Sequence, residues 1–258
     1  MSWLARPSSR SPEQEYTMPL IETARGALYL ADHRRDGRPV VVLVHGAGGT
    51  HLDWPRAVRQ VGCLAVDLNG HYKSAGDGHA DMAGHADDLA ALLDALGIDR
   101  AIVCGHSMGG AVALTFAIQH PDRMLGMALI STGARLRVNP EILRRAEHDP
   151  DSLDAFLLDY LWAGDPSKRG PRQRPAVVAR DYLAANAFDA RPWLDAIRMP
   201  TLVLCGTADR MTPPKLSEAI ATAIPGAELH LIEGAGHMLQ LERPTAVAEY
   251  LIGWVATL

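Results

Sequence analysis

The sequence predicts an α/β fold, in which helices cover a mostly parallel β-sheet, because two patterns alternate along the chain. The first pattern is a series of short, continuously apolar segments, each ended by glycine or a polar turn. Continuous apolarity over so few residues indicates a strand that is buried on both faces, as in a parallel sheet between layers of helices. The segments are 40–44, 63–66, 101–104, 125–130, 201–205 and 228–232.

The second pattern is helical and lies between these segments. Residues 108–119 are apolar on nearly all sides and include many small residues, which indicates a buried helix. This helix ends at His120, because a residue that precedes proline avoids the helical region. The last helix begins near Pro244 and runs to the end of the sequence. Another helix has leucines at the spacing i, i+3, i+4, i+7, a face that packs on the sheet. These leucines are Leu89, Leu92, Leu93 and Leu96.

One long segment, between Ile130 and Thr201, interrupts the alternation with broken helical patterns and no strand-like run. We therefore expect a helical cap over the sheet, spanning about residues 132–196. The cap contains more apolar residues than a segment that only crosses the surface would need. We therefore expect some of them to line a substrate pocket. The alternative is that they only pack the cap together. The helical patterns cover 142–146, 152–162 and 175–187, and the candidate pocket residues are Phe156, Tyr160, Leu161 and Trp162.

Length and composition indicate a globular protein. A chain of 258 residues is within the range of one α/β domain, which we expect to span residues 19–258. Residues 1–18 are rich in Ser, Pro, Arg and Glu and predict a poorly ordered tail. The 48% hydrophobic content excludes a disordered chain, and the net charge of −5 gives no reason to expect nucleic acid as a partner. The basic stretch 168–174 is expected to be a solvated loop.

Cysteine usage and the length of the apolar runs indicate the compartment. The three cysteines, Cys63, Cys104 and Cys205, are widely spaced and lie in or beside apolar runs. This pattern predicts buried, reduced thiols rather than disulfides. No run approaches the roughly 20 apolar residues needed to cross a bilayer, and the first residues lack a signal-peptide core. We therefore expect a cytoplasmic protein without a membrane partner, either a monomer or a homodimer.

The most specific chemical signal is the pattern G-x-S-x-G at Gly105–Gly109, which joins an apolar strand to a helix of small residues. A serine hydroxyl is a poor nucleophile unless it is exposed, near a base and near donors for the oxyanion that it creates. A tight strand-to-helix turn presents the hydroxyl, and the flanking glycines let strand and helix approach each other. The pattern therefore predicts that Ser107 is a nucleophile. The alternative is a serine that only caps a buried helix.

A glycine-rich turn, His45-Gly-Ala-Gly-Gly49, follows the first of the predicted strands. Acyl transfer needs preorganised donors for the oxyanion, and the loss of one lowers the rate by about 10²–10³-fold. The backbone amides of Met108 and Ala47 are the two candidates for this oxyanion hole. A phosphate-binding loop is the alternative for such a turn, but the Walker A spacing and its Lys-Ser/Thr pair are absent.

The acid and the base are expected later in the chain. Asp209 follows the apolar segment 201–205, and His237 follows the segment 228–232. Both side chains would lie at the edge of the sheet where Ser107 emerges, because parallel strands end at the same edge. The order Ser, Asp, His along the chain is the one expected for a triad on this architecture. We therefore predict that His237 is the base and that Asp209 orients it.

Taken together, these motifs resemble the α/β-hydrolase superfamily from about Leu20 to Leu258. The resemblance implies an α/β-hydrolase fold, with a mostly parallel eight-stranded sheet and the cap between strands six and seven. It also implies structural roles for His45, His71 and His106. The motifs that carry it are H-G-x-G-G at 45–49, the loop 67–74, the serine elbow, G-x-x-D at 206–209 and G-x-G-H at 234–237.

The loop at 67–74 departs from the family's usual D-x-P-G-H-G-x-S. Asn69 stands in place of the proline, and Tyr72 stands in place of the second glycine. The departure concerns the backbone of that loop and leaves the triad unaffected.

These observations predict a carboxylesterase-like serine hydrolase that cleaves small-molecule esters of short to medium acyl chain through an acyl-enzyme. The elbow serine distinguishes the chain from haloalkane dehalogenases and epoxide hydrolases, which use Asp, and from dienelactone hydrolases, which use Cys. The alternatives that share the triad are a C–C bond hydrolase, an enol-lactonase, a perhydrolase and a thioesterase. A non-catalytic ligand receptor is the alternative from another class. The sequence has no H-E-x-x-H or C-x-x-C motif, so we expect neither a metal nor another cofactor.

Overall fold

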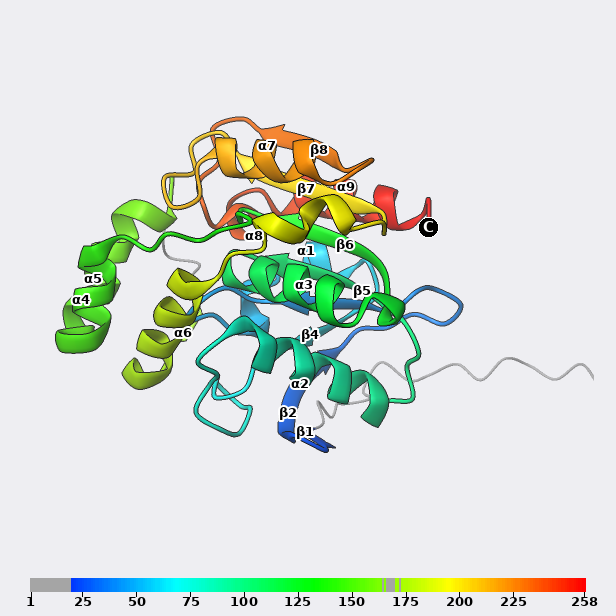
Figure 1. Ribbon diagram of the computed structural model, residues 1–258, viewed down its shortest axis with the longest axis horizontal. Helices are drawn as coiled ribbons and strands as arrows, with labels where there is room; N and C mark the ends of the chain where they lie inside the picture. The colour runs from blue at the N-terminus through cyan, green and yellow to red at the C-terminus, as the bar shows by residue number, and fades with distance from the viewer. Residues whose placement is uncertain (1–19, 164, 166–169, 172) are drawn as a thin grey trace, which may run out of the picture.

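The computed structural model describes residues 20–163, 165, 170–171 and 173–258 (Figure 1). The expected tail at 1–18 and three of the four basic residues of the stretch 168–174, Lys168, Arg169 and Arg172, lie outside these residues. Eight strands form one sheet in the order β1-β2-β4-β3-β5-β6-β7-β8. The strands are β1 (Leu20–Thr23), β2 (Gly26–Asp32), β3 (Val41–Val44), β4 (Cys63–Val66), β5 (Ala101–His106), β6 (Met124–Ile130), β7 (Thr201–Gly206) and β8 (Glu228–Ile232).

The sheet is mostly parallel, as predicted. β2 pairs antiparallel with β1 and with β4, whereas all pairs from β4 through β3 to β8 are parallel. Val42 lies opposite Val103 of β5, and Cys104 lies opposite Ala128 of β6. Because parallel strands end at the same edge, the loops that follow β3, β5, β7 and β8 meet there.

Helices cover both faces of the sheet. The short α1 (Arg56–Arg59) and α9 (Pro244–Val255) pack on one face, while α2 (Met82–Ala95), α3 (Met108–Gln119) and α7 (Pro214–Ala223) pack on the other (Figure 1). Successive residues of β3 alternate between the two layers: Val42 and Val44 contact the α2–α3 side, and Val41 and Leu43 contact the α9 side. Further short helical turns are η1 (His51–Asp53), η2 (Pro121–Arg123) and α8 (Leu239–Glu242).

A group of helices lies between β6 and β7, where the sequence predicted a helical insertion. We call α4 (Pro140–His148), α5 (Pro150–Leu161) and α6 (Pro175–Ala187) the cap; the turn η4 (Arg191–Ala196) leads from it to β7. In Figure 1 the cap projects from one side of the sheet. It has a small apolar cluster of its own, formed by Ile142, Ala146, Leu153, Leu157 and Tyr182.

One strand differs from its prediction. We expected β8 to be buried on both faces, but its side chains are half-buried or exposed, and Leu231 is 41% exposed. β8 is the last strand of the sheet, so no further strand covers its outer edge. The three cysteines are free and buried, as predicted. In the part of the chain that the structure describes, no helix is both long and apolar enough to cross a bilayer.

Candidate active site

Ser107 occupies a strained turn between β5 and α3. Its φ of 53° and ψ of −116° lie in a region that non-glycine residues rarely adopt. The flanking glycines make this turn possible. A Cβ at Gly105 would lie 2.0 Å from the carbonyl oxygen of Gly109, and one at Gly109 would lie 2.2 Å from that of Val44. Any larger residue at either position would push α3 away from the sheet.

His237 connects Ser107 with Asp209, as the order of the motifs predicted. The Nε2 atom of His237 lies 3.0 Å from the Ser107 Oγ. Its Nδ1 atom lies 3.0 Å from Asp209 Oδ2 and 3.2 Å from Oδ1. A proton on Nδ1 therefore faces a carboxylate acceptor, which leaves the lone pair of Nε2 directed at the serine hydroxyl.

The turn after β7 fixes the Asp209 carboxylate. The amides of Met211 and Thr212 donate to Oδ1 at 2.9 and 2.8 Å, and the Thr212 hydroxyl donates to Oδ2 at 2.8 Å. Burial raises the pKa of Asp209, but the charge and hydrogen bond of His237 and the bonds from Thr212 outweigh burial, so this pKa lies below its usual value. Asp209 is therefore ionised at neutral pH. Thr212 was not among the site residues predicted from the sequence.

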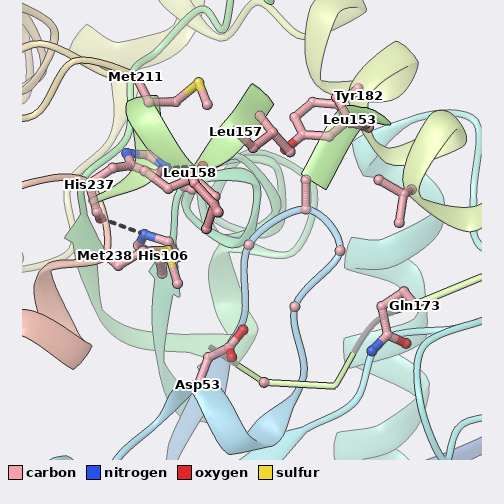
Figure 2. Close-up of a pocket in the computed structure, with 18 of the residues that line it drawn as sticks. Asp53, His106, Leu153, Leu157, Leu158, Gln173, Tyr182, Met211, His237 and Met238 are labelled. Atoms are coloured by element: carbon pink, nitrogen blue, oxygen red, sulfur yellow. Dashed lines mark hydrogen bonds between the residues drawn. The ribbon is translucent and has the colours of Figure 1, made fainter. Parts of the chain in front are cut away.

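The side chains of His45 and His106 form hydrogen bonds with backbone groups around the site. His106 Nε2 donates to the carbonyl of His237 at 2.9 Å, a bond drawn in Figure 2, and burial lowers the pKa of His106 to about 3. His45 Nδ1 lies 2.8 Å from the Gly46 carbonyl, and its Nε2 accepts the Leu68 amide at 3.0 Å. Both rings are buried, and their contacts with backbone fit the structural roles implied by the family resemblance.

The glycine-rich turn after β3 packs directly against Ser107. A Cβ at Gly46 would lie 3.2 Å from the Ser107 Cβ and 2.9 Å from His106 Nδ1. Ala47, one of the two expected oxyanion donors, lines the cavity beside Ser107. Met108, the other, is the first residue of α3, where backbone N–H groups lack intrahelical acceptors. We call residues 46–49, which contain one of the two expected donors, the oxyanion loop.

A cavity of about 370 Å³ lies between the oxyanion loop and the cap. Ser107, His106 and His237 line it from the sheet side. Leucines of α5 line the cap side, and Figure 2 shows three of them, Leu153, Leu157 and Leu158, grouped on the same side of the view as Met211 and Tyr182. The wall on the cap side of the cavity is therefore largely apolar.

Only part of the expected pocket set lines this cavity. Leu161 and Trp162 do so, but Phe156 and Tyr160 do not. The rings of Phe156 and Tyr160 instead pack on each other, with centroids 5.1 Å apart. Arg145 lies 4.7 Å above the Phe156 ring, and Arg210 lies 5.2 Å above the Tyr160 ring. These two aromatic residues occupy the neighbouring face of α5, which corrects the expectation for them.

Two polar residues, Asp53 and Gln173, line the far part of the cavity, and Figure 2 shows both away from the α5 leucines. Asp53 ends the turn η1 and accepts the Thr50 amide at 3.1 Å. Burial raises the pKa of Asp53 to about 6, although the Thr50 amide opposes this effect. In the described part of the chain, no three His, Cys, Asp or Glu residues are placed to hold a metal ion.

Comparison with known proteins identifies the family of this chain. A model of the family described as "Alpha/beta hydrolase family" matches residues 41–250. The chain belongs to the alpha/beta hydrolase family. The match spans β3 through most of α9, so it includes the oxyanion loop and the loops that carry Ser107, Asp209 and His237.

Several relatives of this alpha/beta hydrolase are hydrolases. It is 31% identical to a pimeloyl-[acyl-carrier protein] methyl ester esterase of Neisseria meningitidis, over 81% of this chain and 89% of that protein. It is 26% identical to a 2-hydroxy-6-oxo-6-phenylhexa-2,4-dienoate hydrolase of Burkholderia cepacia, over 84% and 87%. It is also 33% identical to the polyketide synthase ThaQ of Burkholderia thailandensis, over 92% of this chain but only 13% of that much longer protein.

The solved structure of an enol-lactonase from Burkholderia xenovorans LB400 has a similar fold. It superposes on this alpha/beta hydrolase with a TM-score of 0.83 at 25% identity, covering 92% of this chain and 100% of the other. Together with the sequence relatives, this likeness supports a hydrolase.

The unusual loop of this alpha/beta hydrolase, at 67–74, adopts a defined conformation. Tyr72, which stands where a glycine is usual, has a left-handed φ of 42°. Its amide donates to Gln173 Oε1 at 2.7 Å, so the loop is tied to the segment before α6. Asn69, which stands in place of proline, accepts the Gly78 amide at 3.0 Å through its side chain. Both departures are thus accommodated by hydrogen bonds.

Proposed function

We propose that the protein is a serine hydrolase that cleaves carboxylic esters of short to medium acyl chain through an acyl-enzyme. The observation that carries the proposal is the continuous line of hydrogen bonds from Asp209 through His237 to Ser107, with 3.0 Å at each side of the imidazole. This line ends at an apolar cavity that has the volume for a small ester.

In the acylation step, Ser107 Oγ attacks the ester carbonyl carbon while His237 Nε2 takes the hydroxyl proton. The carbonyl oxygen becomes an oxyanion, to which the amides of Ala47 and Met108 donate. When the tetrahedral intermediate collapses, the bond to the alcohol breaks, and His237 gives its proton to the departing alkoxide. Asp209 stabilises the imidazolium that exists between these transfers.

In the deacylation step, water takes the place of the alcohol. His237 accepts a proton from this water, whose oxygen attacks the acyl carbon, and the same amides stabilise the second oxyanion. Collapse of this intermediate returns the proton to Ser107 Oγ and releases the carboxylic acid. In each step, therefore, His237 accepts the proton of the attacking hydroxyl or water and returns it to the departing oxygen.

The cavity supports the preference for acyl chains of limited length. Leu153, Leu157, Leu158 and Leu161 of α5 line the same cavity as Ser107, and burial of an apolar acyl group against them is favourable by about 25 cal/mol per Å². The similarity to a methyl ester esterase points in the same direction.

The first test replaces the nucleophile. Ser107→Ala is expected to fold normally and to lower kcat on p-nitrophenyl esters by about 10⁴–10⁶-fold, because triad members act as a unit. Ser152→Ala, which removes a hydroxyl that contacts Arg145 on the cap, is the matched control. Activity of Ser107→Ala above about a tenth of the wild-type value would contradict the proposal.

A second candidate is hydrolysis of an enol-lactone or of a C–C bond on the same triad. The fold likeness to an enol-lactonase and the sequence similarity to a dienoate hydrolase favour it. A panel of p-nitrophenyl esters of rising acyl length, tested beside a lactone and a C–C substrate, ranks the candidates by kcat/KM; peroxide added to the ester assay detects perhydrolysis. A chain that only binds ligands would leave Ser107 unlabelled by a fluorophosphonate probe.

A further inference from the structure

A buried carboxylate of the cap contacts the oxyanion loop. Asp181 lies on α6, and its side chain is fully buried. Its Oδ2 accepts the amide of Gly48 at 2.8 Å and also lies 2.8 Å from His71 Nε2. Asp181 is separated from these partners by 133 and 110 residues along the chain. One oxygen atom therefore joins the cap, the oxyanion loop and the loop that follows β4.

His71 is arranged to balance the charge of Asp181. Its Nδ1 lies 3.1 Å from the Asn69 carbonyl, so both ring nitrogens face oxygen acceptors. Burial lowers the pKa of His71, but the charge and hydrogen bond of Asp181, with the Asn69 carbonyl, outweigh it, so this pKa lies above its usual value. The two side chains form a buried imidazole–carboxylate contact, and the His45 ring lies 4.7 Å from that of His71.

The contact constrains the loop where its conformation affects the oxyanion. The amide of Gly48 belongs to the peptide plane that follows Ala47, and each peptide unit is rigid. Fixing that plane limits the rotation about Ala47 and hence the direction of the Ala47 N–H. Gly48 has a φ of 64°, and three of the four residues in this loop are glycine, so the backbone itself restricts the loop only weakly.

Stability alone does not account for this arrangement. The Oδ1 atom of Asp181 is buried without a hydrogen-bond partner in the described part of the chain. A buried ion pair with an orphaned oxygen contributes little to folding, because desolvation offsets the attraction. What the Asp181 carboxylate supplies is a charged acceptor for a backbone amide, which binds more tightly than a neutral one.

We propose that Asp181 is a positioning residue by which the cap holds the oxyanion loop in its donor geometry, with His71 as the counter-charge. The inference rests on the proposed acyl-transfer function. Val178 and Tyr182 of the same helix line the substrate cavity. The helix that encloses the substrate therefore also fixes the orientation of the Ala47 amide. The position of the cap and the stabilisation of the oxyanion are coupled in this way.

The test compares turnover with binding of an oxyanion mimic. Asp181→Leu keeps the size of the side chain but removes its acceptors; kcat is expected to fall about 10–100-fold, less than the loss of a whole donor. Affinity for a trifluoromethyl ketone, whose Ser107 adduct carries an oxyanion, is expected to fall by the same factor, with KM nearly unchanged. Asp181→Asn keeps one acceptor oxygen, and we expect it to restore about a third to a tenth of the wild-type values.

Val177→Ala is the matched control, because Val177 is buried one turn earlier on α6 and is not among the residues that line the cavity. It should lower the melting temperature without changing kcat or ketone affinity. The inference is overturned if Asp181→Leu keeps both values near wild type, or if Val177→Ala loses both to the same extent at an equal loss of stability. Should Asp181→Leu not fold, unchanged values in Asp181→Asn overturn it.

The same data separate this inference from the proposed function. If the wild-type protein shows no Ser107-dependent turnover and does not bind the ketone, the proposed function fails, and the inference fails with it. If the wild-type protein turns over esters and binds the ketone tightly while the Asp181 variants do the same, only the inference fails.

Discussion

Asp209 is held by more donors than its pairing with His237 requires. Two amides and the Thr212 hydroxyl donate to its carboxylate, and the same hydroxyl lies 3.1 Å from His237 Nδ1. These bonds fix the carboxylate before any substrate arrives, so the imidazole is oriented without reorganisation. The charge and hydrogen bond of His237 are the main causes of the lowered pKa of Asp209, and the bonds from Thr212 both add to this effect and hold the carboxylate in place.

Asp209→Asn is expected to lower kcat by about 10³–10⁴-fold, because an amide group favours the wrong tautomer of His237. The loss should appear at every pH, since no protonation of the asparagine can restore the carboxylate. Steady-state kinetics on a p-nitrophenyl ester measure it.

Glu233→Gln is the control for this substitution, because Glu233 is an exposed carboxylate in the loop that carries His237. It should remain near the wild-type rate. If Glu233→Gln were inactive and Asp209→Asn were active, the assignment of Asp209 as the acid would be wrong.

Single residues differ in how far the sequence predicts them. Ser107, Asp209 and His237 each follow an apolar strand, so their meeting at one sheet edge was predictable from local patterns. Asp181 is a lone aspartate in a helix, and its partners are more than a hundred residues away, so no local pattern marks it. Thr212 carries one weak signal, its position three residues after Asp209 in the same turn.

At the scale of elements, α5 shows why its lining residues could not all be predicted. A helix turns by 100° per residue, so Leu153, Leu157 and Leu161 share one face, and Phe156 and Tyr160 share the next. Both faces are apolar, and hydrophobic periodicity does not say which of them faces the cavity. The aromatic residues have partners of their own in Arg145 and Arg210.

Leu157→Ala is expected to shift the preferred ester toward longer or bulkier acyl groups, because the smaller side chain enlarges the cavity that Ser107 also lines. The change in relative kcat/KM should be about 10- to 200-fold, the scale of one missing or added methylene in an apolar pocket. A series of p-nitrophenyl esters of rising acyl length gives the profile.

Phe156→Ala is the matched variant on the adjacent face of the same helix. It should lower the melting temperature and leave the acyl-length profile unchanged. If both variants shift the profile, or if neither does, the division of α5 into a lining face and a packing face is wrong.

The strands were predicted unevenly. β3 to β7 were identified by continuous apolar runs, because each is buried on both faces. β2 contains a run of the same kind, at 27–31, so the signal for it was present in the sequence although it was not used. β1 is only four residues long and none of its side chains is fully buried, so no continuous apolar run marks it.

At the scale of the whole molecule, Asp53 makes stability depend on pH in an unusual direction. Burial raises its pKa from 3.8 to about 6, so the folded state holds a proton that the unfolded state has already released. Stability from this group is therefore present below about pH 4 and is lost as the pH rises through about 6. The total is on the order of 2–3 kcal/mol, since one pH unit within the window is worth about 1.4 kcal/mol.

Asp53→Asn removes this ionisation, so its stability relative to wild type should improve between pH 4.5 and pH 8. Urea unfolding at both pH values measures the difference. Asp99→Asn, a change at an exposed aspartate, should leave the pH dependence as in wild type. Parallel stability curves for wild type and Asp53→Asn would show that Asp53 does not titrate in this range.

The distance in sequence between Ser107 and His237 has a consequence for the protein during its synthesis. The two residues are 130 positions apart, and His237 follows β8, the strand at the edge of the sheet. At typical elongation rates, the histidine is added roughly 6–26 s after the serine. A nascent chain that has already paired β3, β5 and β6 therefore carries the Ser107 hydroxyl without its imidazole, and the triad forms only when the last strand joins the sheet.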